Sequence, residues 1–124
     1  DSSAYTPMLN AREQTAAILT TVCTLRDPHQ TLGKLYSDLV GPGGNRVNYM
    51  DADLDAMLDK AAAETDSAER LELYADIQQY LYDRVVYIPL YNMKTMTATT
   101  AKIRGFDLIL PTNYQKYNNV YFVD

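Results

Sequence analysis

Residues 51–83, DADLDAMLDKAAAETDSAERLELYADIQQYLYD, decide the fold of this 124-residue chain. Apolar side chains recur in this stretch at spacings of three and four, the period of a helix with one face toward a core. Asp51 stands directly before the first apolar run and Asp66 before the second, where an aspartate caps a helix N-terminus. Glu69 completes a capping box with Asp66. The stretch therefore predicts two consecutive helices, the longer one from Asp66 to about Asp83.

The longer helix carries apolar residues around more than one face. One stripe consists of Leu71, Tyr74, Ala75, Gln78, Leu81 and Tyr82. A second set, Leu73, Ile77 and Tyr80, widens it. A helix that is apolar over so much of its circumference is buried on more than one side, so we expect it to be covered on two sides.

Three elements are expected upstream of these helices. A helix runs from residue 2 or 3 to about residue 14, and residues 15–22, TAAILTTV, form a strand buried on both faces. Asp27 and Pro28 open the next helix, as N-cap and first helical residue. Its apolar stripe is Leu32, Leu35, Tyr36 and Leu39. The glycine-rich residues 41–45, GPGGN, end that helix in a loop.

Strands are expected downstream. Residues 85–91, VVYIPLY, read as a strand in which Pro89 indicates an edge or a bulge. Residues 95–103 are a second strand candidate, and the tail from 114 to 123 includes a short strand at its end. The order of helices and strands predicts an α/β or α+β arrangement, and 124 residues make one domain.

Composition excludes several classes of function. A net charge of −5 argues against a nucleic-acid partner, because binding phosphates needs a basic face. One cysteine excludes an internal disulfide, and one histidine excludes motifs that need two. No apolar run approaches the roughly 20 residues that cross a bilayer. The sequence also lacks a nucleophile elbow, a P-loop and a dinucleotide-binding glycine motif, so nothing in it points to an enzyme.

Acidic residues concentrate between Asp51 and Asp76, where nine acids accompany two bases. Asp51, Asp53 and Asp55 imitate the start of a calcium-binding EF-hand loop. Such a loop needs glycine at its sixth position and glutamate at its twelfth, and alanines occupy both places here. The pattern therefore favours a solvated acidic helix face over a metal site.

Cys23 and His29 are the residues with the widest chemical range. His29 could serve as a metal ligand together with Cys23 and Asp27, or lower the pKa of the Cys23 thiol to make a nucleophile. The alternative interpretation is a structural histidine inside a helix N-terminus and an inert cysteine at the end of a strand. The alternative is favoured, because no spacing identifies a residue that would orient such a pair.

Residues 20–28, TTVCTLRDP, form the best candidate for a ligand-binding site. They lie where a buried strand ends and a capped helix begins, which is where ligands gather in open α/β sheets. The start of the helix would offer free N–H groups, and Arg26 would add a fixed cation. A plain strand-to-helix turn is the alternative.

An ordered set of motifs carries a resemblance to a known family. Residues 48–61 read N-Y-x-D-x-x-L-D-x-M-L-x-K-A, residues 66–81 read D-x-x-x-R-x-x-L-Y-x-x-I-Q-x-Y-L, and residues 87–91 read Y-I-P-L-Y. The Asp27-Pro28 pair before them and the Ile103-x-Gly105 triplet after them are similar to further landmarks. The set resembles the C-terminal region of the family 5 extracellular solute-binding proteins, the receptors of ABC importers for peptides, nickel and related solutes.

The resemblance implies a fold and a place in the cell. Residues 1–124 would be a C-terminal lobe fragment of a longer solute-binding protein, with helices packed on a small mixed sheet. The lobe would belong to a two-lobed, periplasmic-binding-protein-like fold of type II, in which the solute lies between the lobes. The resemblance also implies export to the periplasm or the extracellular face of the membrane, with or without a lipid anchor, and a membrane permease as partner.

The resemblance leaves the solute open. Oligopeptide receptors of the family have a tryptophan and an aspartate before the motif's proline, but Thr21 and Thr24 stand at those positions and supply neither a ring nor a charge. Arg26 instead favours an anionic or carboxylate-bearing group. A peptide-like solute is the first expectation, and a nickel or other metal chelate is the alternative, because Asp-Pro-His resembles the nickel-type members.

The expected ligand-binding residues are Thr21, Cys23, Thr24, Leu25, Arg26 and His29, with no catalytic residue and no cofactor. A lobe by itself lacks half of the contacts to the solute, so we expect the chain to bind solute weakly or not at all. The rival from another class is a protein–protein interaction module, which could self-associate through its tyrosine-rich edges; the chain has eleven tyrosines.

Overall fold

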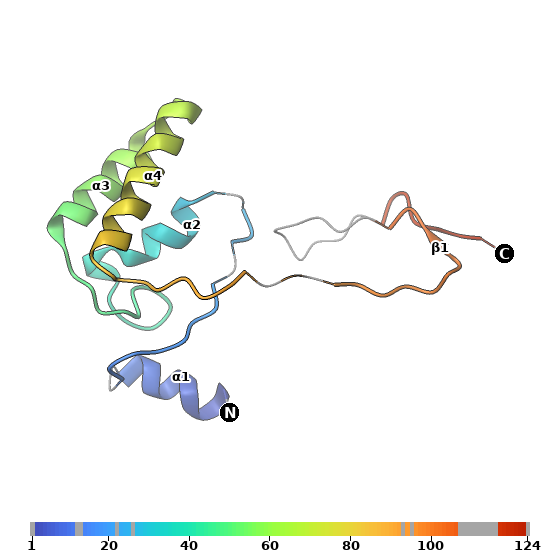
Figure 1. Ribbon diagram of the computed structural model, residues 1–124, viewed down its shortest axis with the longest axis horizontal. Coiled ribbons are helices and arrows are strands. Elements are labelled where there is room, and N and C mark those ends of the chain that lie inside the picture. The colour runs from blue at the N-terminus through green and yellow to red at the C-terminus, as the bar shows by residue number, and fades with distance from the viewer. Residues whose placement is uncertain are drawn as a thin grey trace.

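The computed structural model describes residues 2–11, 14–21, 23–25, 27–92, 94, 96–106 and 117–123. Its elements in chain order are α1 (Ser2–Ala11), α2 (His29–Leu32), the 3₁₀ turns η1 (Gly33–Leu35) and η2 (Ser37–Leu39), α3 (Ala52–Ala63), α4 (Ser67–Asp83), β1 (Ile103–Arg104) and β2 (Tyr121–Phe122). Helices α3 and α4 stand side by side and α2 crosses their base, while the chain after α4 extends away to the C-terminus (Figure 1). Arg26 and the start of the expected tail strand lie outside the described residues.

The two helices predicted from residues 51–83 are confirmed, together with their caps. The Asp51 carboxylate accepts hydrogen bonds from the N–H groups of Asp53 and Leu54, and Asp66 does the same for Ala68 and Glu69. The capping box differs in one respect. Glu64, and not the expected glutamate of the first turn of α4, accepts the hydrogen bond from the Asp66 N–H at 2.8 Å.

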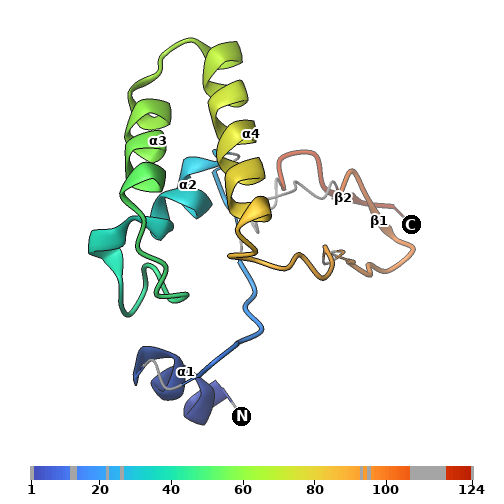
Figure 2. The ribbon, with the colours of Figure 1, turned by 60° about the vertical axis from the view of Figure 1, so that its left-hand side comes forward.

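The core lies between α3, α4 and η1. Its buried members are Leu35, Leu54, Leu58, Ala61, Tyr74, Ile77 and Leu81. We call α2, η1 and η2 together the α2 region. Figure 2 shows α3 and α4 as a helical hairpin with α2 against one of its sides. The expectation that α4 is covered on two sides is wrong for the described residues. The second set, Leu73, Ile77 and Tyr80, packs against or within the core, but Leu71, Ala75, Gln78 and Tyr82 of the first stripe are exposed. A single hairpin has one inner face and leaves the other face of α4 unpaired.

The helix expected from Asp27 breaks into three short pieces, α2, η1 and η2. Tyr36 leaves the helical region with φ −51° and ψ 139°. The buried Asn45 side chain explains the break, because its Nδ2 donates to the carbonyl oxygens of Leu35 at 3.0 Å and Tyr49 at 2.6 Å. A carbonyl that has a side-chain partner no longer needs the helical ladder. The loop predicted over residues 41–45 supplies that asparagine.

Most of the expected strands are absent from the described part of the chain. Residues 14–21 and 87–92 are extended without a ladder, and Ile18 and Ile88 are 71% and 72% exposed. Of the expected strands, only two short ones are paired: β1, which begins at the last residue of the candidate at 95–103, and β2 within the tail. They are antiparallel, with Ile103 opposite Phe122. Gly105 follows β1 at φ +70°, where a Cβ would lie 1.9 Å from the Asn119 carbonyl oxygen.

The expected helices packed on a small mixed sheet are therefore not found. The described sheet has two antiparallel strands and lies at the far end of the extended arm from the α3–α4 hairpin (Figure 1). An apolar segment becomes a strand only when a neighbour completes its ladder of hydrogen bonds, and the described residues offer none to 14–21 or 87–92. The coarser expectation stands, since a small domain of mixed helix and sheet is compatible with the α/β class. Among the described residues, no helix is long and apolar enough to cross a membrane.

The α3–α4 contact gives the first prediction. Leu58 is fully buried, so Leu58→Ala should lower the free energy of unfolding by about 2–5 kcal/mol, measured by urea unfolding with circular dichroism. The matched Leu71→Ala change on exposed α4 surface should alter it by less than about 0.5 kcal/mol. If the alanine variant does not fold, Leu58→Met should fold with a loss under about 1.5 kcal/mol. Equal effects at both leucines would contradict this core.

Candidate functional site

The loop before α2 is closed by one side chain. The Gln30 Oε1 accepts hydrogen bonds from the N–H groups of Thr24 at 2.7 Å and Leu25 at 3.0 Å. The Gln30 Nε2 donates to the Thr24 Oγ1 at 2.7 Å. Two of these hydrogen bonds hold the backbone of residues 24 and 25, and the third holds the Thr24 side chain. We call residues 23–25 the 23–25 loop. Its shape is therefore set before any ligand arrives.

The residues predicted for ligand binding in and beside this loop differ in how exposed their side chains are. Leu25 is 72% exposed and Thr21 is also exposed, so both are accessible to a solute. Cys23 is half-buried, and its Sγ lies 3.5 Å from the Asp27 carbonyl oxygen, to which it donates. The thiol therefore has a partner within the chain, in agreement with the structural interpretation of the cysteine.

Asp27 ties the loop to α4 across 43 residues of sequence. Its carboxylate receives the Arg70 Nη2 at 2.9 and 3.1 Å from its two oxygens. The His29 backbone N–H donates to the same carboxylate at 2.9 Å. The pKa of Asp27 is lowered, first by the His29 N–H and then by the Arg70 hydrogen bond. Arg70 also donates from Nε to the Ala61 carbonyl at 3.2 Å, so one guanidinium joins the loop, α3 and α4.

His29 faces α4. Its Nδ1 lies 2.8 Å from the Tyr74 hydroxyl, and its ring meets the rings of Tyr36 and Tyr74 edge-on, with centroids 6.1 Å apart in each case. The Arg70 Nη2 lies 3.4 Å from the same hydroxyl and can only donate to it. Tyr74 therefore accepts from the guanidinium and shares a second hydrogen bond with the His29 ring. This geometry places the imidazole in a packing role beside the loop.

The N–H groups at the start of α2 have partners within the chain. The His29 N–H donates to the Asp27 carboxylate, and the Gln30 N–H donates to the Asp27 carbonyl at 3.1 Å. Thr31 donates to the Pro28 carbonyl at 3.1 Å. The prediction that these N–H groups are free is therefore wrong, because the Asp27 carboxylate and the turn itself use them; the N-cap of α2 is Pro28 and not the expected Asp27. Arg26, the other group predicted to favour an anion, lies outside the described residues.

Asp51 forms a second polar cluster that sequence reasoning identified only as a helix cap. Besides its capping bonds, its Oδ2 accepts from the hydroxyls of Tyr49 and Tyr80, the latter at 2.9 Å. The Arg84 Nε lies 3.7 Å from the same oxygen, and the Arg84 guanidinium stacks 3.3 Å from the centre of the Tyr80 ring. The four-residue spacing of Tyr80 and Arg84, which places both on one side of a helix end, was the sequence signal that could have identified this cluster.

The calcium alternative finds no support in this geometry. Asp51 is committed to capping and to the tyrosines, and Asp55 accepts from the Ser37 N–H at 2.9 Å. The Tyr36 hydroxyl donates to Asp59 at 2.9 Å. Within the part of the chain that the structure describes, no three histidine, cysteine or acidic side chains are grouped to hold a metal ion. The acidic side chains of α3 serve as caps and as hydrogen-bond acceptors for the η2 region.

Comparison with known proteins finds one partial relative to report. The chain is 30% identical over 81 residues to the Probable D,D-dipeptide-binding periplasmic protein DdpA of Escherichia coli (strain K12). The match covers 64% of this chain and 16% of the relative, so the chain spans about a sixth of that protein's length. No family model matches the chain, and no solved structure matches it. The similarity supports the resemblance to solute-binding proteins of family 5.

The ion pair between Asp27 and Arg70 gives the second prediction. Arg70→Gln should speed amide hydrogen exchange of the 23–25 loop and α2, because the anchor of the loop on α4 is lost. Exchange in the middle of α3 and α4 should stay slow. The matched Lys34→Gln change on exposed η1 surface should leave the loop unaltered. Unchanged exchange in Arg70→Gln, or equal acceleration throughout the hairpin, would contradict this role.

The hydrogen bond from the Tyr49 hydroxyl to the Asp51 carboxylate makes the stability of the fold depend on pH in acid and in alkali. The pKa of Asp51 is lowered from 3.8, first by the Tyr49 hydroxyl and also by the Tyr80 hydroxyl. The contribution of this carboxylate to stability is therefore present above about pH 3.8 and is lost as the pH falls through the lowered value. The pKa of Tyr49 is raised from 10.0 to about 12, chiefly by the bond to Asp51. Its contribution is present below pH 10 and is lost as the pH rises through about 12.

A third prediction follows from this pair. Asp51→Asn should move the pKa of Tyr49 back toward its ordinary value, because the negative acceptor is gone. The ultraviolet absorbance of tyrosinate, titrated in the variant and in the parent chain, measures the shift. The variant should also lose part of its stability at neutral pH and depend less on pH in acid. Asp38→Asn removes the same charge from exposed surface and should leave the titration unchanged; equal titrations in both variants would refute the assignment.

Proposed function

We propose that this chain is part of the solute-binding component of an ABC importer of family 5. The observation that carries the proposal is the 81-residue similarity to a periplasmic protein whose name states dipeptide binding. The chain would form part of the C-terminal lobe of a two-lobed fold of type II. The protein would lie in the periplasm or at the extracellular face of the membrane. Its partners would be a peptide-like solute and a membrane permease.

The residues that carry the family resemblance support a shared scaffold. Asp27 and Arg70 anchor the loop on α4, and Asp51 joins the start of α3 to Tyr80 near the end of α4. Leu54 is fully buried in the core. Each of these side chains has partners within the chain, so the resemblance supports a shared scaffold and does not identify the solute.

The proposed site is the 23–25 loop with its neighbours. Thr21 and Leu25 are accessible, Thr24 is fixed by Gln30, and Arg26 would add the cation for a carboxylate. The complete set that we propose is Thr21, Cys23, Thr24, Leu25, Arg26 and His29. His29 would act indirectly, because its ring is turned to Tyr74 and shapes the base of the loop.

The proposed mechanism is closure of two lobes and involves no chemical reaction. A solute held between the lobes stabilises the closed population by the contacts that it makes only there. The rigid backbone of the 23–25 loop would lower the entropic cost of that contact, since the loop is ordered in advance. The permease would then distinguish the closed from the open shape.

The fourth prediction tests this site on the chain as it is. D-alanyl-D-alanine, L-alanyl-L-alanine and a nickel–histidine chelate are titrated against isotope-labelled protein and followed by amide chemical shifts. We expect weak binding of a dipeptide, in the millimolar range, with shifts confined to residues 21–29. Leu25→Ser should weaken it, while Met96→Ser, a change at another exposed apolar residue, should not. Submicromolar binding would overturn the two-lobe account, and shifts elsewhere or chelate binding alone would overturn the proposed peptide site.

A further inference from the structure

The turn that follows α4 contains a residue in an unfavourable backbone conformation. Val85 has a φ of +53°, in the left-handed region that glycine normally occupies after a helix. A β-branched residue is strained at such a φ. Asn48, at +56°, is the other described non-glycine residue with a positive φ, but asparagine tolerates this region. Val85 is therefore held in place by its surroundings, against its own preference.

Two hydrogen bonds and one apolar contact hold this turn. The Val85 N–H donates to the Tyr82 carbonyl oxygen at 3.0 Å, and the Val86 N–H donates to the Leu81 carbonyl oxygen at 3.1 Å. This pair is the Schellman pattern, which ends many helices. Val86 also packs against the core. The Val85 side chain adds little to these contacts, because it is 66% exposed.

Residues 86–91, which we call the strap, continue from this turn with few attachments to the hairpin. Within the described part of the chain, the backbone of residues 87–91 makes no hydrogen bond. Ile88, Leu90 and Tyr91 are exposed. Segments with so few contacts belong to the least stable parts of a fold, and they open without unfolding of the core.

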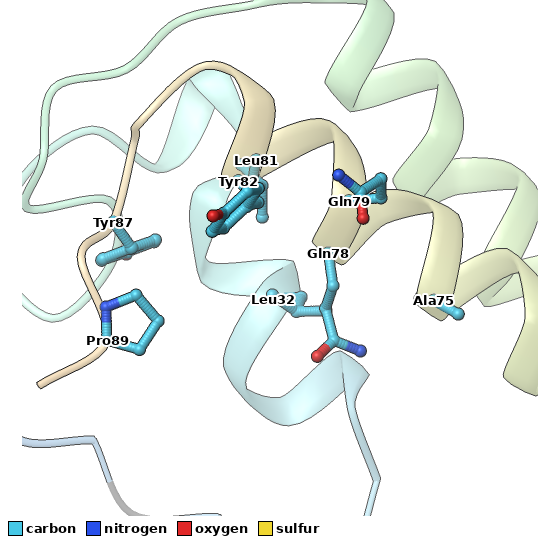
Figure 3. A pocket seen from close by; sticks show the side chains of 8 residues that line it. All are labelled: Leu32, Ala75, Gln78, Gln79, Leu81, Tyr82, Tyr87 and Pro89. Atoms are coloured by element: carbon cyan, nitrogen blue, oxygen red, sulfur yellow. The ribbon is translucent and has the colours of Figure 1, made fainter. Parts of the chain in front are cut away.

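Two side chains of the strap cover a cavity of about 500 Å³ beside α2 and α4. Tyr87 and Pro89 line it together with Leu32 of α2 and Leu81 of α4. Figure 3 shows the rings of Tyr87 and Pro89 on one side of the cavity, on the segment after α4. Burial raises the pKa of Tyr87, in agreement with this position. The side chains of the strap therefore form one wall of the cavity.

We propose that the strap opens and closes over this cavity, with Val85 as its hinge. In the closed state that the structure shows, the strain at Val85 opposes the cap hydrogen bonds and the contacts of Tyr87 and Pro89. In the open state Val85 returns to a negative φ, and Leu81 at the edge of the core becomes accessible while α3 and α4 stay packed. Because each state loses what the other gains, the two lie close in free energy and both are populated. This proposal is independent of solute binding.

The test uses the isotope-labelled chain as it is. Relaxation dispersion should show the amides of residues 85–91 exchanging together on the millisecond timescale, while the middle of α3 and α4 does not. Val85→Gly should lower the open population by about fivefold, because glycine adopts the positive φ without strain. Hydrogen exchange of the Val86 amide should slow by about the same factor. The matched Val85→Thr change keeps the β-branch and should leave both measurements within about twofold.

A second pair of variants tests the contacts of the strap. Tyr87→Ala removes part of the cavity wall and should raise the open population by about threefold or more, whereas Tyr91→Ala, at a residue that is 73% exposed, should not. A parent chain without shared exchange at residues 85–91 would have a fixed, strained turn, and the proposal would be wrong. Exchange that Val85→Gly leaves unchanged, or that also involves the middle of the hairpin, would overturn it as well.

Discussion

The packing of α3 against α4 is the contact on which the rest of the structure depends. Leu54 and Leu58 on one helix meet Tyr74 and Ile77 on the other without contact with water. Apolar area removed from water is the main favourable contribution in a domain of this size, and this hairpin supplies nearly all of the described core. The α2 region, which follows the 23–25 loop, adds Leu35 to the same core. The hairpin therefore supports the segment that carries the proposed solute site.

Polar clusters fasten the hairpin at both ends. At one end Asp51 joins the start of α3 to Tyr80 and Arg84 near the end of α4. At the other end Arg70 joins the start of α4 to the last turn of α3 and to Asp27, which follows the 23–25 loop. The first of these clusters uses a helix cap, Asp51, as a tertiary partner. The family resemblance rests largely on these residues, which explains why it indicates a scaffold without indicating a solute.

The sequence predicted correctly the elements that depend on residues close together in the chain, and not those that depend on distant residues. The helices α3 and α4 were predictable because caps and apolar spacing act within a few residues. The break of the α2 region was not, because Asn45 reaches Leu35 from ten residues away. In the site, the position of the loop could be read from Asp27-Pro28, but the partners of His29 and Asp27 lie 43 to 45 residues farther along the chain.

The sequence alone determined two capped helices, the turn before α2 and the acidic character of the surface, since all of these depend on residues close to one another in the chain. Tertiary structure decided which face of α4 is covered, that the N–H groups of α2 are occupied, and that the apolar segments at 14–21 and 87–92 run without a ladder. The physical reason is that burial and strand pairing require a second surface. No pattern within a single segment states whether that surface is present.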